Sequence, residues 1–189
     1  MLPPKLYKGR LFSSPGLNRD SSLTKPSPIP DTTVSSHQTP NSLIKIDFPE
    51  PDFKVIKEGD KTLIFDRLRK RYVTLTPEEW VRQNFLQYLF KIKNYPPALT
   101  AVEREIYLGE LKKRFDIVLY NRQMTPWMLI ECKEMNVPLS QQTLEQVVRY
   151  NMVIPAKYLV ITNGTNTFCC TYDHTARQWS FLQEMPAYE

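Results

Sequence analysis

Hydrophobic and polar positions along this chain of 189 residues change their period several times, and each change predicts a different element. The first change comes near residue 46, where a stretch rich in Ser, Thr and Pro gives way to β-branched and aromatic residues. Two runs there, FKVIKEGDKTLIFD and RYVTLT, include a Gly-Asp turn and predict an N-terminal β-hairpin. Residues 1–45 have no sustained apolar period, so they cannot offset their ordering entropy by burial, and we predict a disordered tail.

A helix is predicted directly after this hairpin. Thr76 suits the N-cap, Pro77 suits the first helical position, and Glu78 and Glu79 complement the positive end of the helix dipole. Apolar residues then recur at helical spacing, at Val81, Phe85, Leu89 and Ile92. Asn94-Tyr95-Pro96-Pro97 ends the helix. On this pattern Glu78 faces the sheet with the apolar stripe, and Glu79 begins the polar edge.

The sheet is predicted from the apolar runs that follow. Residues 99–108 form one strand, and RFDIVLYNRQMTPWMLIECKEM (114–135) forms a hairpin of two more. Ser140 caps a second helix, QQTLEQVVRYNM, which Pro155 closes before the buried strand YLVIT at 158–162. The runs TFCCTY and QWSFL predict a final hairpin. The predicted class is therefore α/β or α+β, in the order αβββαβ with a hairpin at each end and helices packed on the sheet.

Composition places residues 46–189 among ordinary globular domains, since the chain is 41% hydrophobic and 24% charged. No apolar run approaches the roughly 18 residues of a membrane span, and three cysteines make no disulfide framework, so we expect a cytoplasmic protein. Of the net charge of +5, the tail 1–45 holds +4, so total charge is no evidence that the domain binds nucleic acid. Two local basic runs, 67–71 and 112–114, are either phosphate contacts or solvated faces.

The hairpin at 114–135 carries charges where a core strand should have none. If its turn centres on Gln123-Met124, Asp116 lies opposite Glu131 with Cβ atoms about 4.5–5.5 Å apart, and Lys133 follows on the same face. Facing like charges destabilise a sheet unless a cation lies between them, and Mg²⁺ is typically held by one or two carboxylates. The alternative is a buried carboxylate–lysine ion pair without metal or activity.

Two motifs carry a resemblance to a known family. Asp116, followed after fourteen residues by Glu131-Cys132-Lys133, resembles the D…E-x-K signature of PD-(D/E)xK nucleases, with Phe115 where the motif often has proline. Gln146 and Tyr150 form Q-x-x-x-Y, which is similar to an element of the N-terminal nuclease domain of type I restriction enzyme R subunits. Residues 50–189 resemble that domain throughout, and the tail lies outside the resemblance.

The resemblance implies a restriction-endonuclease-like domain over residues 46–189 that hydrolyses DNA phosphodiesters with Mg²⁺ or Mn²⁺. It implies that Asp116, Glu131 and the carbonyl of Cys132 bind the metal, with Lys133 as the catalytic lysine. Gln146 and Tyr150 would hold the lysine side or the scissile phosphate. The family often adds a first-helix glutamate, for which Glu79 is favoured over Glu78. The residues expected to contact DNA are Arg149, Lys112, Lys113 and Arg114.

DNA is thus the expected partner, with other restriction-system subunits as further candidates. The chain has no G-x-x-x-x-G-K-[ST] motif, so we expect no ATP-driven motor. Two alternatives remain open: a non-catalytic DNA- or protein-binding module that kept the fold, and a protein whose ion pairs only stabilise the sheet. We expect Cys169 and Cys170 to be core thiols and not to form a metal site with His174, because adjacent strand residues point to opposite faces. Glu103 and Glu105 either approach the site or are solvated.

Overall fold

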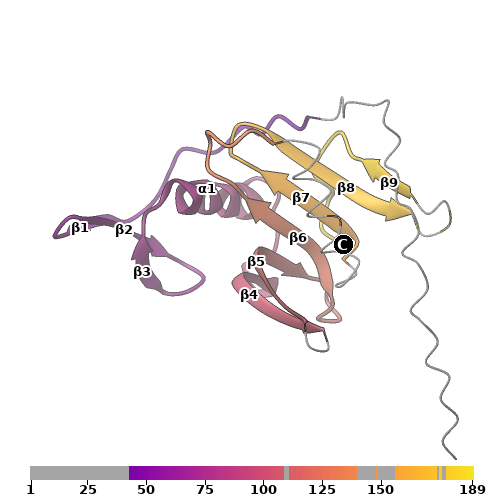
Figure 1. Ribbon diagram of the computed structural model, residues 1–189, viewed down its shortest axis with the longest axis horizontal. Helices are drawn as coiled ribbons and strands as arrows, with labels where there is room; N and C mark the ends of the chain where they lie inside the picture. Colours follow the sequence, from indigo (N-terminus) through magenta and orange to yellow (C-terminus); the bar gives the residue numbers. More distant parts are fainter. Residues whose placement is uncertain (1–42, 109–110, 140–147, 149–155, 174, 176–177) are drawn as a thin grey trace, which may run out of the picture. The chain divides into compact units, whose positions relative to one another are not determined.

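A computed structural model describes residues 43–189 except 109–110, 140–147, 149–155, 174 and 176–177. One α-helix and two β-sheets make up these residues, which confirms a mixed α+β class (Figure 1). The predicted tail and nearly all of the predicted second helix lie outside the described residues. Within that helix only Val148 is described, and it is helical. The complete restriction-endonuclease order, with a helix on the second face, therefore stays a prediction.

The N-terminal hairpin is one strand larger than predicted. Strands β1 (Val55–Glu58), β2 (Lys61–Asp66) and β3 (Arg71–Thr74) form an antiparallel three-stranded sheet in the order β1-β2-β3. Gly59, with φ +58°, makes the left-handed turn between β1 and β2, a conformation that glycine adopts without steric cost. We call this three-stranded unit the small sheet.

Helix α1 (Pro77–Lys91) begins where its sequence predicts and ends before the predicted stop at Asn94-Tyr95-Pro96-Pro97. The Thr76 side chain accepts a hydrogen bond from the Glu79 N–H at 3.0 Å, which satisfies one of the exposed donors of the first turn. Val81, Phe85 and Leu89 are fully or nearly fully buried. Ile92 was expected on the same buried stripe, but it is 51% exposed because the helix has already ended at Lys91.

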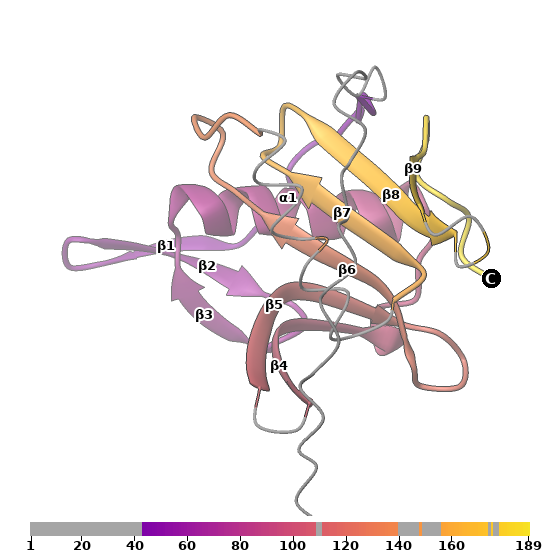
Figure 2. The same ribbon diagram turned by 45° about the vertical axis from the view of Figure 1, so that its right-hand side comes forward.

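After the short 3₁₀ turn η1 (Pro97–Leu99), six strands form the large sheet in their chain order (Figure 2). Strands β6 and β7 pair in parallel and every other neighbouring pair is antiparallel. The strands are β4 (Thr100–Leu108), β5 (Leu111–Tyr120), β6 (Pro126–Cys132), β7 (Tyr158–Thr162), β8 (Thr167–Asp173) and β9 (Gln178–Phe181). The three strands after α1, the strand at 158–162 and the final hairpin are therefore confirmed.

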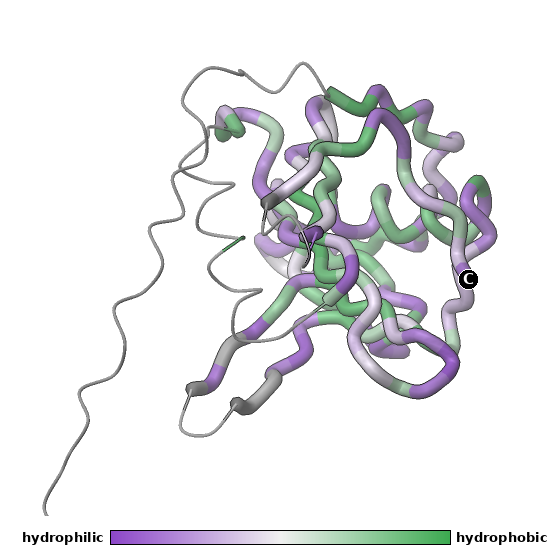
Figure 3. Tube along the Cα trace, turned by 90° about the vertical axis from the view of Figure 1, so that its right-hand side faces the viewer, coloured by the Kyte–Doolittle hydropathy of each residue, from purple (hydrophilic) through white to green (hydrophobic). Residues whose placement is uncertain are grey.

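Alternation along these strands divides the core into two clusters, and hydrophobic and hydrophilic positions can be followed along the trace in Figure 3. The first cluster joins α1 to side chains such as Ile117, Ile130 and Val160. The second contains Val118, Leu129 and their neighbours on β7 and β8. Both clusters meet on β5 and β6, so these two strands are held from both sides. In the described part of the chain, no helix is long and apolar enough to cross a membrane.

Candidate active site

The register of β5 and β6 brings the two predicted metal ligands together. Ile117 pairs with Ile130 at this end of the β5–β6 ladder, and Asp116 and Glu131 are the next residues of the two strands. The turn that sets this register is closed by Asn121, whose side chain accepts hydrogen bonds from the backbone of Gln123 and Thr125. The predicted register is therefore confirmed as far as Ile117 and Ile130, and the charge of Asp116 acts on Glu131 just beyond that pair.

Both oxygens of Asp116 are engaged. Oδ2 accepts the backbone N–H of Cys132 at 2.7 Å, and Oδ1 accepts from the Arg82 guanidinium at 2.7 Å. Arg82 belongs to α1, and its side chain is only 4% exposed. The sheet tolerates a carboxylate at this position because a backbone donor and a buried cation satisfy it.

The backbone is irregular where Asp116 lies. Phe115 packs in the second core cluster and Ile117 in the first, although residues two apart in a strand normally share a face. On the neighbouring strand β4, Val102 pairs with Ile117 and Arg104 pairs with Phe115, and Glu103 between them has φ +47°. A non-glycine residue in this left-handed region carries backbone strain, and such strain concentrates at functional sites. The irregularity re-aims the Asp116 side chain toward α1.

Glu131 and Lys133 form the second half of the site. Lys133 Nζ donates to Glu131 Oε1 at 2.7 Å, and the two side chains are 30% and 21% exposed, respectively. Burial and the nearby charge of Asp116 raise the pKa of Glu131, although Lys133 partly opposes this shift. Burial by itself would lower the pKa of Lys133, but its bond to Glu131 and the charges of Glu131, Asp116 and Glu78 together outweigh burial and raise it. Lys133 is thus a fixed ammonium group beside two carboxylates.

The two first-helix glutamates have exchanged their expected places. Glu79, predicted on the polar edge, is 5% exposed and is bound by Arg69, Arg82 and Gln83. Glu78 is the more exposed of the two, with a side chain 45% accessible, and contacts Arg82 at 3.2 Å. Its charge also acts on Glu131 and Lys133. Glu78 is therefore the first-helix glutamate that borders the predicted site.

These residues belong to a larger group, which we call the carboxylate cluster. Arg69 bridges Asp66, Glu79 and Glu103, and Arg82 bridges Glu79, Glu103 and Asp116. The cluster holds six carboxylates and three cations, a formal charge of −3. The members are Asp66, Glu78, Glu79, Glu103, Asp116 and Glu131, with Arg69, Arg82 and Lys133.

The chemistry of this donor set suits a hard divalent cation. Two carboxylates, with water and phosphate oxygens completing the shell, are a usual arrangement for Mg²⁺, and the surplus negative charge favours any cation there. The described residues offer no group of three or more metal-ligating side chains in binding geometry. Asp116 and Glu131, with Glu78 nearby, are the residues that would hold the ion, and Asp116 would then exchange Arg82 for it.

The remaining predicted site residues divide into two groups. Gln146, Arg149 and Tyr150 lie outside the described residues, so their roles stay predictions. Lys112 is exposed and forms an ion pair with Glu105 at 2.9 Å, and Arg114 is exposed on β5. Lys113 pairs with Ile106 in the ladder between β4 and β5. DNA contact by Lys112, Lys113 and Arg114 therefore also stays a prediction.

Sequence reasoning missed Arg82 and Arg69 as members of the site. Arg82 follows Glu78 by four residues and Glu79 by three, a spacing at which helical side chains meet, so the pattern E-E-x-x-R was an available signal. Arg69 had no such signal, because its partners Glu79 and Glu103 are brought to it only by folding. The sequence left open whether Glu103 approaches the site or is solvated, and the structure places it in the carboxylate cluster.

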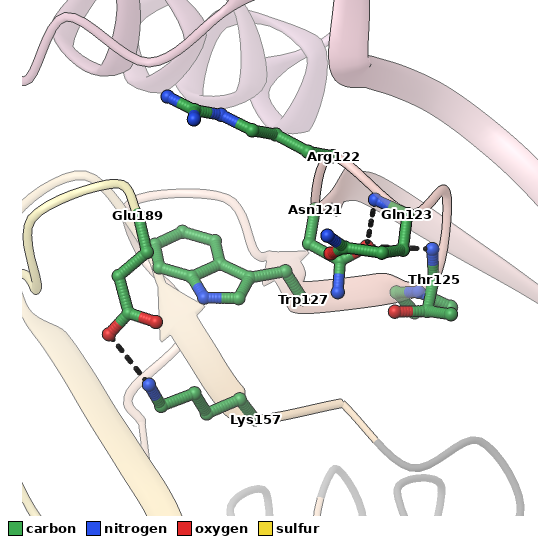
Figure 4. A pocket seen from close by; sticks show the side chains of 8 residues that line it. Asn121, Arg122, Gln123, Thr125, Trp127, Lys157 and Glu189 are labelled. Carbon is green, nitrogen blue, oxygen red and sulfur yellow. Dashed lines mark hydrogen bonds and ion pairs between the residues drawn. The ribbon is translucent and has the colours of Figure 1, made fainter.

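A hollow of about 490 Å³ lies elsewhere, at the turn between β5 and β6 (Figure 4). Its lining includes Arg122, Trp127 and Lys157, and Lys157 donates to Glu189 at 2.7 Å. The indole nitrogen of Trp127 is buried without a hydrogen-bond partner. None of the predicted catalytic residues lines this hollow, so its size does not bear on the chemistry of the carboxylate cluster.

Comparison with known proteins supplies the family. Residues 77–186, more than half of the chain, match the family model described as the N terminus of type I restriction enzyme R proteins. The chain belongs to this family. The match begins at the first residue of α1 and includes every predicted catalytic and metal-binding residue, which confirms the resemblance inferred from the D…E-x-K and Q-x-x-x-Y motifs. The comparison with curated proteins gives no match.

Among solved structures, the chain is similar to a fragment of a putative HsdR subunit of a type I restriction enzyme from Vibrio vulnificus. The two are 23% identical, and the match covers 47% of this chain and 19% of the other, with a TM-score of 0.33. This chain therefore spans about a fifth of the length of that fragment. At this TM-score the likeness carries no argument about the arrangement of the site.

Proposed function

We propose that this member of the R-protein N-terminal family is a Mg²⁺- or Mn²⁺-dependent DNA phosphodiesterase. The observation that supports the proposal most is the carboxylate of Glu131, which lies close enough to Asp116 to feel its charge and is bound by the ammonium group of Lys133. Family membership supports a nuclease-like domain in a restriction context, with DNA and other subunits as partners. The metal dependence, the chemistry and the residue roles are the proposal.

Each residue has a task that its contacts explain. Asp116 is held by the Cys132 N–H, so its carboxylate stays oriented while Arg82 leaves Oδ1 to a cation. Lys133 places a positive charge where the attacked phosphate becomes more negative, and fixed charges of this kind stabilise such transition states. Glu131 anchors that lysine through Oε1. A bound divalent cation would supply Lewis-acid activation of the attacking water and the phosphate.

Arg82 stabilises the protein before a metal binds. Six carboxylates in one cluster repel one another, and the buried guanidinium neutralises Asp116 and Glu79 at once. Burial alone would lower the pKa of Arg82, yet Asp116 and Glu79 outweigh that effect and raise it, so the group stays charged. Arg82 is thus a positioning residue for Asp116 in the proposed reaction.

The test combines metal binding with cleavage. Mn²⁺ should raise the melting temperature of the wild-type protein, because a ligand at 100 times its Kd stabilises by about 2.7 kcal/mol. Asp116→Asn should lose this shift, and both Asp116→Asn and Lys133→Met should nick supercoiled DNA at least about 10²-fold more slowly. Asp47→Asn, an exposed carboxylate that precedes the small sheet, is the matched control and should behave as wild type.

Equal nicking by wild type and Asp116→Asn would contradict the proposal and indicate a contaminating nuclease. A second candidate function is favoured by one observation: Arg82 occupies Asp116 Oδ1. A non-catalytic DNA- or protein-binding module would keep that ion pair permanently. It would show neither a Mn²⁺-dependent shift in melting temperature nor nicking with any divalent metal.

A further inference from the structure

The small sheet differs from the rest of the described chain in charge. Residues 54–74 hold seven basic and three acidic side chains, a net charge of +4. The other residues from 43 to 189 hold thirteen basic and fifteen acidic side chains, a net charge of −2. A local excess of this size on 21 residues creates a positive surface even though the domain as a whole is nearly neutral.

Most of this charge is available to a ligand. Arg67 pairs with Asp52 at 2.9 Å, and Arg69 is held in the carboxylate cluster. The other five cations are exposed, and no carboxylate in the described part of the chain forms an ion pair with them. These five are Lys54, Lys57, Lys61, Lys70 and Arg71.

One face of the small sheet also exposes apolar and aromatic surface. Register places Ile56 beside Leu63, and Phe65 beside Tyr72, on one face. Ile56 and Tyr72 are each 40% exposed, and the Phe65 and Tyr72 rings meet edge to face at 5.2 Å between centroids. An aromatic side chain at the surface of a basic sheet is suited to stack on an unpaired base.

The small sheet is joined directly to the carboxylate cluster. Arg69 lies in the connection between β2 and β3, and its guanidinium reaches Glu79 on α1 and Glu103 on β4 at 3.0 Å. Glu103 lies across the β4–β5 pair from Asp116. The next two residues after Arg69 are Lys70 and Arg71, so two exposed cations flank the edge of the cluster.

From these observations we infer that the small sheet binds the phosphate backbone of DNA beside the carboxylate cluster, with Lys70 and Arg71 nearest the reacting phosphate. The inference rests on the proposed function, because it takes DNA as the substrate. Carboxylates repel a phosphate backbone, and a cluster with a formal charge of −3 needs a neighbouring cationic surface to retain it. The acidic surface of a partner protein is the competing occupant.

The experiment measures DNA binding without cleavage. Binding of a fluorescent duplex with a single-stranded overhang is followed by anisotropy in EDTA, over about 50–200 mM salt. Each lost phosphate contact lowers the slope of log K against log salt by about 0.9, so K70Q/R71Q should lower it by nearly 2. K57Q/K61Q, two exposed lysines at the β1–β2 turn end of the small sheet, should lower it as well.

The control variant is K45Q/R122Q, which removes the same charge from exposed positions outside the small sheet. It should keep the wild-type slope. A wild-type slope in K70Q/R71Q would overturn the inference, and this is the result that an acidic protein partner predicts. An equal loss of slope in K45Q/R122Q would also overturn it, since binding would then depend on total charge. Circular dichroism checks that each variant is folded.

Failure of this inference and failure of the proposed function give different results. If Asp116→Asn abolishes cleavage while K70Q/R71Q binds DNA normally, the nuclease proposal stands and DNA binds elsewhere. If no variant or metal gives cleavage but K70Q/R71Q lowers the salt slope, the small sheet binds DNA and the chemistry is wrong. Asp116→Asn should itself bind DNA at least as tightly as wild type in EDTA, because it removes a negative charge.

Discussion

At the scale of single residues, neighbouring charges decide how each carboxylate of the site behaves. The carboxylate of Asp116 is bound by a backbone N–H and by a guanidinium. Burial and the charge of Asp116 disfavour the ionised form of Glu131, whereas the ammonium group of Lys133 favours it. Two carboxylates in neighbouring strands are thus in different electrostatic environments, which is how one site can hold groups with different tasks.

Glu131 gives a pH prediction at this scale. Its pKa in the folded protein lies above the ordinary value, so the folded state binds the proton more tightly than the unfolded state. The free energy of unfolding of the metal-free protein should therefore lose a contribution as pH rises from the ordinary glutamate pKa to the raised one. Glu131→Gln lacks this loss, so its stability relative to wild type should increase over that pH range and then level off.

The measurement is urea unfolding in EDTA at several pH values from 4.5 to 8 for both proteins, beginning at the ordinary pKa of the group. The constant offset from the lost bond to Lys133 does not affect the trend with pH. A difference between the two proteins that stays flat, or that moves toward wild type as pH rises, would contradict the assigned cause.

At the scale of elements, the first turn of α1 combines two roles in adjacent residues. Glu79 receives guanidinium groups from the β2–β3 connection and from its own helix, so it holds the small sheet to α1. Glu78 remains partly exposed toward Glu131 and Lys133. Because helical residues point about 100° apart, neighbours in sequence can belong to a buried ion cluster and to a site edge, respectively.

Substitution of each glutamate distinguishes these roles. Glu79→Gln removes one partner of a buried ion cluster and should lower the free energy of unfolding by about 3–5 kcal/mol. Glu78→Gln changes a half-exposed pair and should cost less than about 1 kcal/mol. Chemical denaturation measures both. If instead Glu79→Gln were nearly neutral for stability and abolished Mn²⁺ binding, Glu79 would be the metal ligand that the sequence favoured.

At the scale of the whole molecule, the large sheet contributes to two buried core clusters, and the three cysteines lie in them. Cys132, Cys169 and Cys170 are free and at most 3% exposed. Burial raises the pKa of all three thiols, that of Cys170 to about 12. The expectation of core thiols over a metal site at Cys169-Cys170 agrees with this burial.

Thiol labelling should therefore report global unfolding. At pH 8 a pKa near 12 leaves about 10³-fold less thiolate than an ordinary cysteine has, and access is blocked besides. The native protein should react with a disulfide reagent only as fast as it unfolds, and all three thiols should react at once in denaturant. Rapid labelling of one thiol in the native protein would show that its cluster opens locally.

The sequence by itself determined most of the described elements and predicted that Asp116 and Glu131 lie near each other. Local signals suffice for these: Thr76-Pro77 for the helix start, alternation for the strands, and the turn position for the register of β5 with β6. Family membership also followed from motifs within short segments, and the matched range confirms it.

Only the tertiary structure decided which charges share a site. Arg69, Arg82, Glu103 and Asp116 come from four different elements, and no periodicity in the chain states that they meet. The left-handed backbone conformation of Glu103 depends on how β4 pairs with β5, and the exposure of Ile92 depends on where α1 ends. Hydrophobic period is a property of one segment, whereas a charge network depends on distances between segments, and those distances exist only after folding.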